Sequence, residues 1–433
     1  MIEKSVVIFW FRRDLRLDDN RGLCRALSHG GKVLPLFIFD TDILDALNSR
    51  KDRRLVYIQQ ALVRLQTELR KQGSDICVRH GVPEMIFREL LKTYCISAVY
   101  CNEDYEPEAI RRDNDVREIL EEHGVTFHTY KDQVIFDARE VRKADGSPYS
   151  VYTPYSRQWR AKLKKEDYTM EEPDVGQLLS IHLDPVPPLS AVGFLETGDR
   201  FDQPTLDERL IKDYDRFRDF PALDHTTHLG VALRFGTLSI RRCVAVALQH
   251  NETWLGELIW REFFMQILFH YPAVVNRCFK EKYEHVSWRN NESEFYHWCT
   301  GNTGYPLVDA GMRQLNQTGF MHNRVRMVAA SFLTKHLLVD WRWGEAYFAE
   351  KLLDYELASN NGNWQWAAGC GCDAAPYFRI FNPQEQTKKF DKDLHYIKRW
   401  NPDFESLSCP PLVDHVYARE RALKVYRAAL ADR

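Results

Sequence analysis

The chain has 433 residues, of which 44% are hydrophobic, 13% aromatic and 28% charged, and its formal net charge is −3 at pH 7. This composition excludes an intrinsically disordered protein, and no apolar run approaches the roughly 18 residues that a membrane-spanning helix needs. The small net charge gives no indication of a nucleic-acid partner, so a site for one would have to come from local clusters of lysine and arginine.

Neither a secretory signal nor a zinc-binding pattern is found in the sequence. The first residues run directly into an apolar segment, without the longer apolar stretch and the cleavage site of a signal peptide. The ten cysteines lack the paired CxxC spacing of a zinc site. We therefore expect a cytoplasmic protein with reduced thiols, no bound metal and no contact with a membrane.

The N-terminal part alternates short strand-like runs with longer helical segments. Strands are predicted over 5–11, 33–39, 75–79 and 98–102, and helices over 53–71, 83–91 and 106–123. Such alternation is typical of parallel βαβ units with right-handed crossovers. Residues 1–135 are therefore predicted to form a doubly wound α/β domain. Its first turn, at residues 10–16, lacks the glycines of a dinucleotide-binding fingerprint.

Between residues 136 and 213 the sequence becomes rich in turn-forming residues, such as Asp145-Gly146-Ser147-Pro148. This segment separates the α/β pattern from a half that is helical in period and rich in tryptophan. Nine of the eleven tryptophans lie between Trp254 and Trp400, so the aromatic chemistry is concentrated there. We predict an interdomain linker over 136–213 and an all-helical domain over 214–433.

A first helical segment in this half combines acid, base and aromatic side chains. Helical spacing places Trp254, Glu257, Arg261 and Phe264 along one face, with Trp260 beside it. The plain alternative is an amphipathic helix in which Glu257 and Arg261 form an ion pair beside core aromatic rings. This segment alone does not distinguish a site from a packed helix.

A second segment carries a local excess of positive charge. Helical spacing places Asn323, Arg326 and Met327 on adjacent turns. Between residues 311 and 344 five lysines and arginines accompany a single aspartate. Such a cluster suits phosphates, either of a cofactor or of a nucleic acid, although a solvated basic helix face would have the same composition.

In a third segment, residues 352–366, the helix is predicted to stop at Asn360-Asn361-Gly362. A chain break with carboxylates, amides and two tryptophans could present hydrogen-bonding groups to a planar heterocycle between aromatic rings. The alternative is a capped helix followed by a packing loop.

Taken together, these segments resemble the photolyase/cryptochrome family of blue-light flavoproteins. The resemblance rests on residues 10–17, 303–310, 360–366 and 373–383, in the family's order, and residues 321–327 are similar to class I cyclobutane pyrimidine dimer photolyases. It implies an α/β domain followed by an all-helical domain that binds FAD. The implied activity is light-driven repair of UV-damaged DNA, in which excited FADH⁻ lends an electron to a flipped-out pyrimidine dimer.

The resemblance also implies roles for particular residues. Those around FAD would be Tyr214, Thr226, Thr227, His228, Leu229, Gly230, Trp254, Arg261, Arg326, Asp354, Glu356 and Asn360. Those that take part in repair of the dimer would be Glu257, Trp260, Asn323, Met327, Asn360 and Trp366. DNA contacts would come from Arg218, Glu257, Trp260, Asn323, Arg324 and Gln386. Electrons would reach oxidised FAD through Trp288, Trp341 and Trp364.

Side-chain chemistry suits several of these implied roles. An amide at Asn360, opposite flavin N5, can hydrogen-bond to the reduced ring without adding a second negative charge. The indoles of Trp260 and Trp366 offer stacking faces to the flipped bases, worth about 1–3 kcal/mol per base. Glu257 would hydrogen-bond to the thymine edge and stabilise the reduced dimer, and Met327 would fill the remaining apolar gap.

Two alternative functions are less consistent with the sequence than DNA repair. A cryptochrome-type photoreceptor without repair activity is the main alternative, and Asn360 speaks against it because plant cryptochromes carry aspartate there. An FAD oxidoreductase would need a nicotinamide-binding fingerprint, which the sequence lacks.

The sequence does not identify the antenna chromophore. Folate-binding relatives carry Asn-Glu where this chain has Glu108-Ala109 and Cys-Lys where it has Val274-Val275, which disfavours folate as the antenna. A deazaflavin, a second flavin or an empty pocket stay open, and we expect a monomer.

Overall fold

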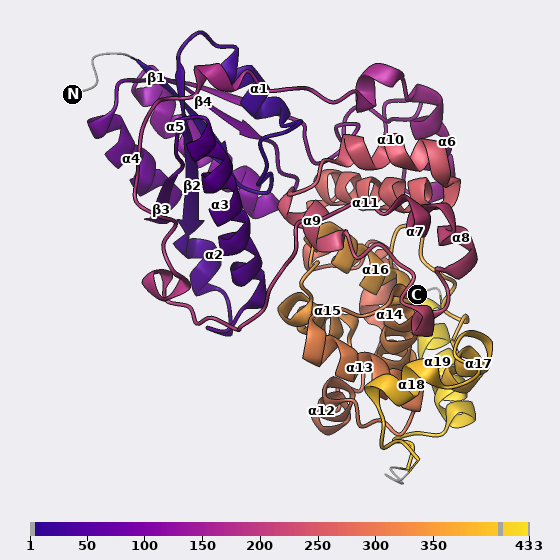
Figure 1. Cartoon of the computed structure of the whole chain (residues 1–433). Helices are drawn as coiled ribbons and strands as arrows, with labels where there is room; N and C mark the ends of the chain where they lie inside the picture. The colour runs from indigo at the N-terminus through magenta and orange to yellow at the C-terminus, as the bar shows by residue number, and fades with distance from the viewer. Residues whose placement is uncertain (1–4, 406–409, 432–433) are drawn as a thin grey trace. The chain divides into compact units, whose positions relative to one another are not determined.

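The computed structural model describes residues 5–405 and 410–431, which divide into two compact units (Figure 1). The first, here called the α/β unit, comprises the described residues of Met1–Glu140, Lys162–Leu206 and Leu229–Gln249. The second, the helical unit, comprises those of Val141–Ala161, Asp207–His228 and His250–Arg433. The segment predicted as a linker, residues 136–213, thus contributes to both units.

A parallel sheet of five strands, in the order β3-β2-β1-β4-β5, forms the centre of the α/β unit. The strands are β1 (Val6–Phe11), β2 (Lys32–Asp40), β3 (Cys77–Gly81), β4 (Ile96–Asn102) and β5 (Thr126–Tyr130). Every residue of β1 is buried, because a central parallel strand is covered on both faces and can be apolar throughout. The predicted doubly wound α/β fold is confirmed.

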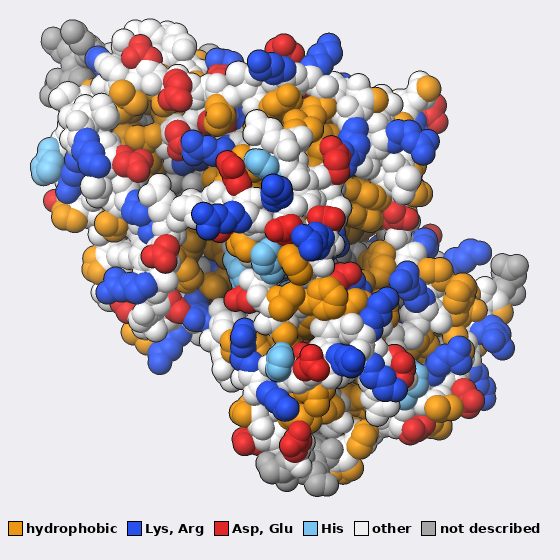
Figure 2. All heavy atoms as spheres, turned by 45° about the vertical axis from the view of Figure 1, so that its right-hand side comes forward, with side chains coloured by type: hydrophobic (Ala, Val, Ile, Leu, Met, Phe, Trp, Pro, Cys, Tyr) orange, Lys and Arg blue, Asp and Glu red, His pale blue; other side chains and the backbone are white. Residues whose placement is uncertain are grey.

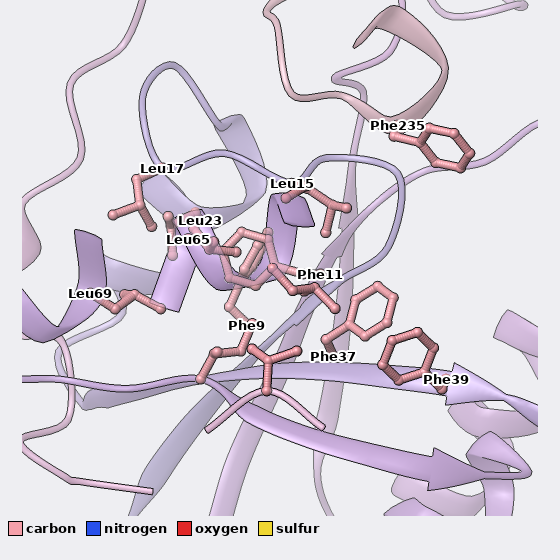
Figure 3. Packing of buried hydrophobic residues seen from close by; sticks show 14 of the residues in the cluster. Phe9, Phe11, Leu15, Leu17, Leu23, Phe37, Phe39, Leu65, Leu69 and Phe235 are labelled. Carbon is pink, nitrogen blue, oxygen red and sulfur yellow. The ribbon is translucent and has the colours of Figure 1, made fainter. Parts of the chain in front are cut away.

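Helices cover both faces of this sheet. They are α1 (Arg21–Leu27), α2 (Thr41–Asp45), α3 (Arg53–Lys71), α4 (Pro83–Thr93) and α5 (Pro107–Glu122). Alternate residues of β1 enter two apolar clusters: Phe9 and Phe11 pack with α1 and α3, as Figure 3 shows, and Ile8 and Trp10 pack with α4 and α5. Successive side chains of a strand point to opposite faces of the sheet, so the two apolar clusters lie on opposite faces.

Two later helices, α9 (Gly230–Phe235) and α10 (Ile240–His250), pack mainly with the α/β unit. The guanidinium of Arg241, fully buried, donates to Asp19 at 2.9 Å and to Asp132 at 2.6 Å. Arg16 donates to the other oxygen of Asp132 at 2.7 Å. Because a buried charge must be paired, these carboxylates hold the start of α10 against the N-terminal segment.

The helical unit is built around an apolar cluster that is rich in tryptophan. Its helices are α6 (Tyr152–Lys162, of which residues up to 161 belong here), α7 (Glu208–Lys212), α8 (Tyr214–Phe217), α11 (Glu252–His270), α12 (Glu292–Thr300), α13 (Pro306–Thr318), α14 (Asn323–Ser331), α15 (Trp341–Lys351), α16 (Leu357–Ala368), α17 (Pro383–Phe390), α18 (His395–Trp400) and α19 (His415–Leu430). A π-helical turn over Phe332–His336 continues α14. Within the described residues, none of the helices combines the length and apolarity needed to cross a bilayer.

The helix stop predicted at residues 360–362 is wrong, because α16 runs unbroken from Leu357 to Ala368. Gly362 is there for close packing between helices: a Cβ at this position would lie 2.1 Å from Cδ1 of Phe264 on α11. Asn361 is held by a different contact, since its side-chain amide donates to the carbonyl of Val274 at 3.0 Å. The glycine and the asparagine therefore belong to the contact of α16 with its neighbours.

We expect Gly362→Ala to lower the stability of the protein by about 1–3 kcal/mol, the usual cost of overpacking a core. The added methyl group must displace the buried ring of Phe264. Gly256→Ala on α11 is the matched control, because its Cβ would meet only the hydroxyl of Tyr152, at 3.5 Å. That variant should gain about 0.5–1 kcal/mol from helix propensity. Thermal unfolding measures both shifts, and equal midpoints for the two variants would contradict this packing argument.

Candidate functional site

A cavity in the helical unit gathers eight of the predicted site residues. It measures about 610 Å³, counting the part that opens to solvent, and is lined by α14, α15, α16 and the chain between α15 and α16. The predicted residues that line it are Asn323, Arg326, Met327, Asp354, Glu356, Asn360, Trp364 and Trp366.

An ion pair forms part of the cavity wall. The guanidinium of Arg326 donates to Asp354 through both terminal nitrogens, at 3.2 and 2.9 Å, in a bidentate arrangement. Its Nε donates to the carbonyl of Met321 at 2.6 Å, so the fork is fixed at three points. Both side chains are mostly buried, and the pairing satisfies their charges where a ligand would exclude water.

Asn360 presents an oxygen acceptor in this cavity. Its side-chain nitrogen donates to Oε1 of Glu345 at 2.8 Å and to the carbonyl of Glu345 at 3.1 Å, and these contacts assign the orientation of the amide. Both N–H bonds are then used, so Oδ1 is left to accept a hydrogen bond from a ligand. Burial raises the pKa of Glu345, and the hydrogen bond from Asn360 partly opposes this shift.

Glu356, another predicted cofactor contact, caps helix α16. Its two carboxylate oxygens accept from the backbone amides of Ala358 at 3.2 Å and Ser359 at 2.8 Å. A carboxylate at a helix N-terminus satisfies unpaired amides and interacts favourably with the helix dipole. Glu356 thus lines the cavity and also fixes the start of the helix that carries Asn360.

The three tryptophans of the predicted electron path contribute to one apolar cluster. Trp364 borders the cavity and is 2% exposed, Trp341 is fully buried, and Trp288 is partly buried against the same cluster. Sequence reasoning did not single out Trp298, whose ring centroid lies 6.0 Å from that of Trp364. Nothing in its sequence context distinguishes Trp298 from an ordinary core residue.

A second group of predicted residues lies on α8, at its C-terminal end and on α11, and does not line this cavity. Arg218 forms an ion pair with Glu257, and its guanidinium lies 5.3 Å from the ring centroid of Tyr214. Burial raises the pKa of Glu257, and Arg218 opposes the shift. Burial, followed by the charge of Glu257, raises the pKa of the Tyr214 phenol. Trp254, near the start of α11, is buried.

Two further residues of α11 are also placed. The indole of Trp260 is partly buried and stacks on Tyr152 of α6. Arg261 follows it on α11 and is half-buried.

The segment before α9 offers polar groups that suit a phosphate. The hydroxyl of Thr226 is buried and has no hydrogen-bond partner within the described part of the chain. Thr227 is half-buried beside it. The ring of His228, at a φ of 51°, lies 2.8 Å from Asp224 through Nε2 and 4.2 Å from the ring of Phe320. A buried hydroxyl without a partner is uncommon unless a ligand or water meets it.

Two further residues predicted to lie around FAD, Leu229 and Gly230, belong to the α/β unit, at the start of α9.

The predicted DNA-contacting cations carry carboxylate partners of their own. Arg324 pairs with Asp219, and its guanidinium lies 4.2 Å over the ring of Phe390. The side-chain oxygen of Gln386, on α17, is buried without a described partner. Lys388 and Lys389 are exposed on the same helix. Figure 2 shows lysine and arginine side chains mixed with acidic ones on the visible face, in keeping with the small net charge.

Comparisons with known proteins cover nearly the whole chain. Residues 7–174 match the family model described as "DNA photolyase", and residues 254–429 match "FAD binding domain of DNA photolyase". A curated relative from Synechococcus, named deoxyribodipyrimidine photo-lyase, is 37% identical over 94% of this chain and 90% of its own.

Two solved structures extend the likeness to the fold. A class III photolyase from Agrobacterium tumefaciens has a TM-score of 0.87 at 34% identity, covering 99% of this chain and 98% of its own. An archaeal photolyase from Sulfolobus tokodaii, solved with two FAD molecules, has a TM-score of 0.84 at 35% identity, covering 98% of this chain and all of its own.

Proposed function

The chain belongs to the DNA photolyase family, and from that membership we propose that it uses light to split cyclobutane pyrimidine dimers in UV-damaged DNA. The observation that carries this proposal is the cavity in which Asn360, the Arg326–Asp354 pair and the indoles of Trp364 and Trp366 meet. The names of the curated relatives favour repair over the alternative of a photoreceptor without repair activity.

The residues of the helical unit fit FAD, the cofactor of this family. When bound, reduced and excited by light, FAD supplies one electron to the dimer and recovers it after the ring has opened. Asn360 offers Oδ1 to a ring N–H without placing a carboxylate there. Arg326 and Asp354 present a compensated pair, and the unpartnered hydroxyl of Thr226 suits a phosphate oxygen.

We assign binding of the lesion to indole, amide and carboxylate side chains of α11, α14 and α16. Trp260 and Trp366 are both partly buried and offer ring faces to unstacked pyrimidines. Glu257 and Asn323 supply hydrogen-bonding groups for the pyrimidine edges. The amide of Asn323 lies 3.9 Å from the sulfur of Met327, so a polar and an apolar group stand side by side. Glu257 would also stabilise the reduced dimer, with Arg218 holding its carboxylate.

DNA affinity should fall steeply with salt, because phosphates must replace the carboxylate partners of the arginines. Theory gives a slope of about −0.9 in log K against log salt for each phosphate contact on duplex DNA. Arg324→Ala should reduce the magnitude of this slope by roughly one. Arg117→Ala, on helix α5 of the α/β unit, is the charge-matched control and should leave the slope unchanged. A salt-independent affinity for the unmodified protein would contradict phosphate anchoring.

The proposed function is tested by illuminating the purified, FAD-loaded protein with an oligonucleotide that contains one cyclobutane thymine dimer. We expect blue light to restore the two thymines, with no reaction in the dark. A photoreceptor would respond to light in its own absorption spectrum and leave the dimer intact, and that result would contradict repair.

We also propose a second flavin as the antenna chromophore. The chain lacks the residue pairs of folate-binding relatives at 108–109 and 274–275, and the Sulfolobus tokodaii relative was solved with two FAD molecules. Chromophores extracted from the purified protein should then contain more than one flavin per chain. A pterin or deazaflavin in the extract would contradict this assignment.

A further inference from the structure

The indole of Trp260 already has a stacking partner within the protein. The ring of Tyr152 lies 3.6 Å away, centroid to centroid, and the two planes differ by 5°. Tyr152 is the first residue of α6, within the segment that the sequence analysis predicted as a linker. Parallel stacking at this distance covers one face of the indole, and the ring of Phe264 packs against the same indole at 5.5 Å between centroids. Trp260 is nevertheless only partly buried, so part of the indole stays accessible to a ligand.

Tyr152 is anchored at both ends. Its hydroxyl donates to the carbonyl of Gly256 at 2.8 Å, one helical turn before Trp260 on α11. Its backbone N–H donates to Oδ2 of Asp373 at 3.0 Å. The ring also packs edge-on against Phe263, at 5.8 Å between centroids. The phenol could leave the indole only by breaking the hydroxyl hydrogen bond, while the backbone hydrogen bond fixes the start of α6. The ring therefore acts as a support for the indole, and an incoming base does not need to displace it.

The rest of α6 is docked on the same helix. The indole N–H of Trp159 donates to Oε1 of Glu262 at 2.6 Å, and the hydroxyl of Tyr155 donates to the same oxygen at 3.2 Å. All three side chains are buried. At the other end, the amide of Gln266 donates to the carbonyl of Tyr149 at 2.8 Å. These contacts hold α6 to α11 on both sides of Tyr152.

We propose that Tyr152 is a positioning residue for lesion binding, which fixes the plane of Trp260 so that the accessible part of the indole meets a pyrimidine of the dimer. This inference rests on the proposed function. A tryptophan held by a stacked neighbour loses little conformational freedom when it binds, whereas an unsupported side chain must be ordered at that moment. Without the ring of Tyr152, the indole of Trp260 loses its stacking contact and must be ordered when the dimer binds. Together these two effects should weaken binding of the dimer by about ten-fold.

The test compares Tyr152→Phe, which keeps the ring, with Tyr152→Leu, which removes it. Dissociation constants are measured for a single-stranded oligonucleotide with one thymine dimer and for the same sequence undamaged. We expect Tyr152→Leu to bind the dimer about ten-fold more weakly, with unchanged affinity for undamaged DNA and unchanged repair per photon at saturation. Tyr152→Phe should retain most of the affinity for the dimer. Tyr296→Leu, an exposed tyrosine of α12, is the control.

FAD content and thermal midpoint show whether each variant is folded. If Tyr152→Leu loses FAD, Tyr152→Met takes its place, because the unbranched, flexible methionine side chain can fill an irregular gap without a planar ring. An unchanged preference for the dimer in the ring-less variant, or an equal loss of affinity for damaged and undamaged DNA, would overturn the role of Tyr152. Failure of the unmodified protein to prefer the dimer would instead contradict the proposed function.

Discussion

Replacing Trp364 with phenylalanine should abolish the light-driven reduction of bound FAD, while repair by protein reduced chemically beforehand persists. Trp364 borders the cavity one helical turn after Asn360 on α16, and it is 2% exposed. An indole can donate an electron to the flavin, and the oxidised indole can then be reduced by Trp341 of the same cluster. A phenyl ring is far harder to oxidise. The change preserves an aromatic ring, so the packing cost should be small.

The measurement is the absorption of oxidised FAD during blue illumination with an external thiol as donor. Trp298→Phe is the matched control, because Trp298 is equally buried and contacts Trp364 but lies outside the predicted path. That variant should still reduce FAD. Persistent photoreduction in Trp364→Phe would contradict the assigned path, and loss of the reaction in Trp298→Phe would redirect it through Trp298.

Arg326→Ala should weaken FAD binding by roughly 100-fold. The substitution leaves the carboxylate of Asp354 without its partner in the cavity wall. Breaking a fully buried pair costs about 3–5 kcal/mol, and because this pair keeps some exposure we expect about 2–3 kcal/mol, which corresponds to that loss of affinity. Titration of the FAD-free protein with FAD, followed by flavin fluorescence, measures it.

Two further variants show whether the unpaired carboxylate of Asp354 causes this loss of FAD affinity. Arg326→Ala combined with Asp354→Ala removes the unpaired charge and should recover part of the affinity. Arg289→Ala breaks a similarly exposed ion pair, with Glu294, and should leave FAD binding unchanged. An FAD affinity in Arg326→Ala equal to that of the unmodified protein would show that the pair does not support the cofactor.

Local pattern predicted most of the α/β fold, because strand and helix alternate visibly in the sequence. Strand β5 was missed, since Thr126–Tyr130, at the edge of the sheet, has no apolar run and no fully buried residue. The packing of α10 with the α/β unit was also not predictable. It depends on Arg241 meeting Asp19 and Asp132, and contacts between residues more than 100 positions apart leave no mark on local periodicity.

For the site, the sequence pattern identified the segments that carry the functional residues, but not the residues that contact them. Asn360 and Trp364 were singled out within a predicted chain break, whereas the structure places them on a continuous helix whose glycine accommodates Phe264. The pattern gave no reason to connect Glu345 with Asn360, or Tyr152 with Trp260. Tyr152, Tyr155 and Trp159 form an aromatic stripe at helical spacing, and that signal could have identified α6 inside the predicted linker.

Repair as proposed requires a closed electron cycle between FAD, bound in the helical unit, and the dimer. The direct measurement starts from protein whose FAD has been reduced once, under anaerobic conditions, with excess dimer-containing oligonucleotide and no further reductant. During blue illumination, the thymine dimers split per flavin are counted and the flavin spectrum is recorded. We predict many dimers split per flavin, with the flavin still reduced at the end. One dimer or fewer per flavin, or a flavin left oxidised, would contradict the account.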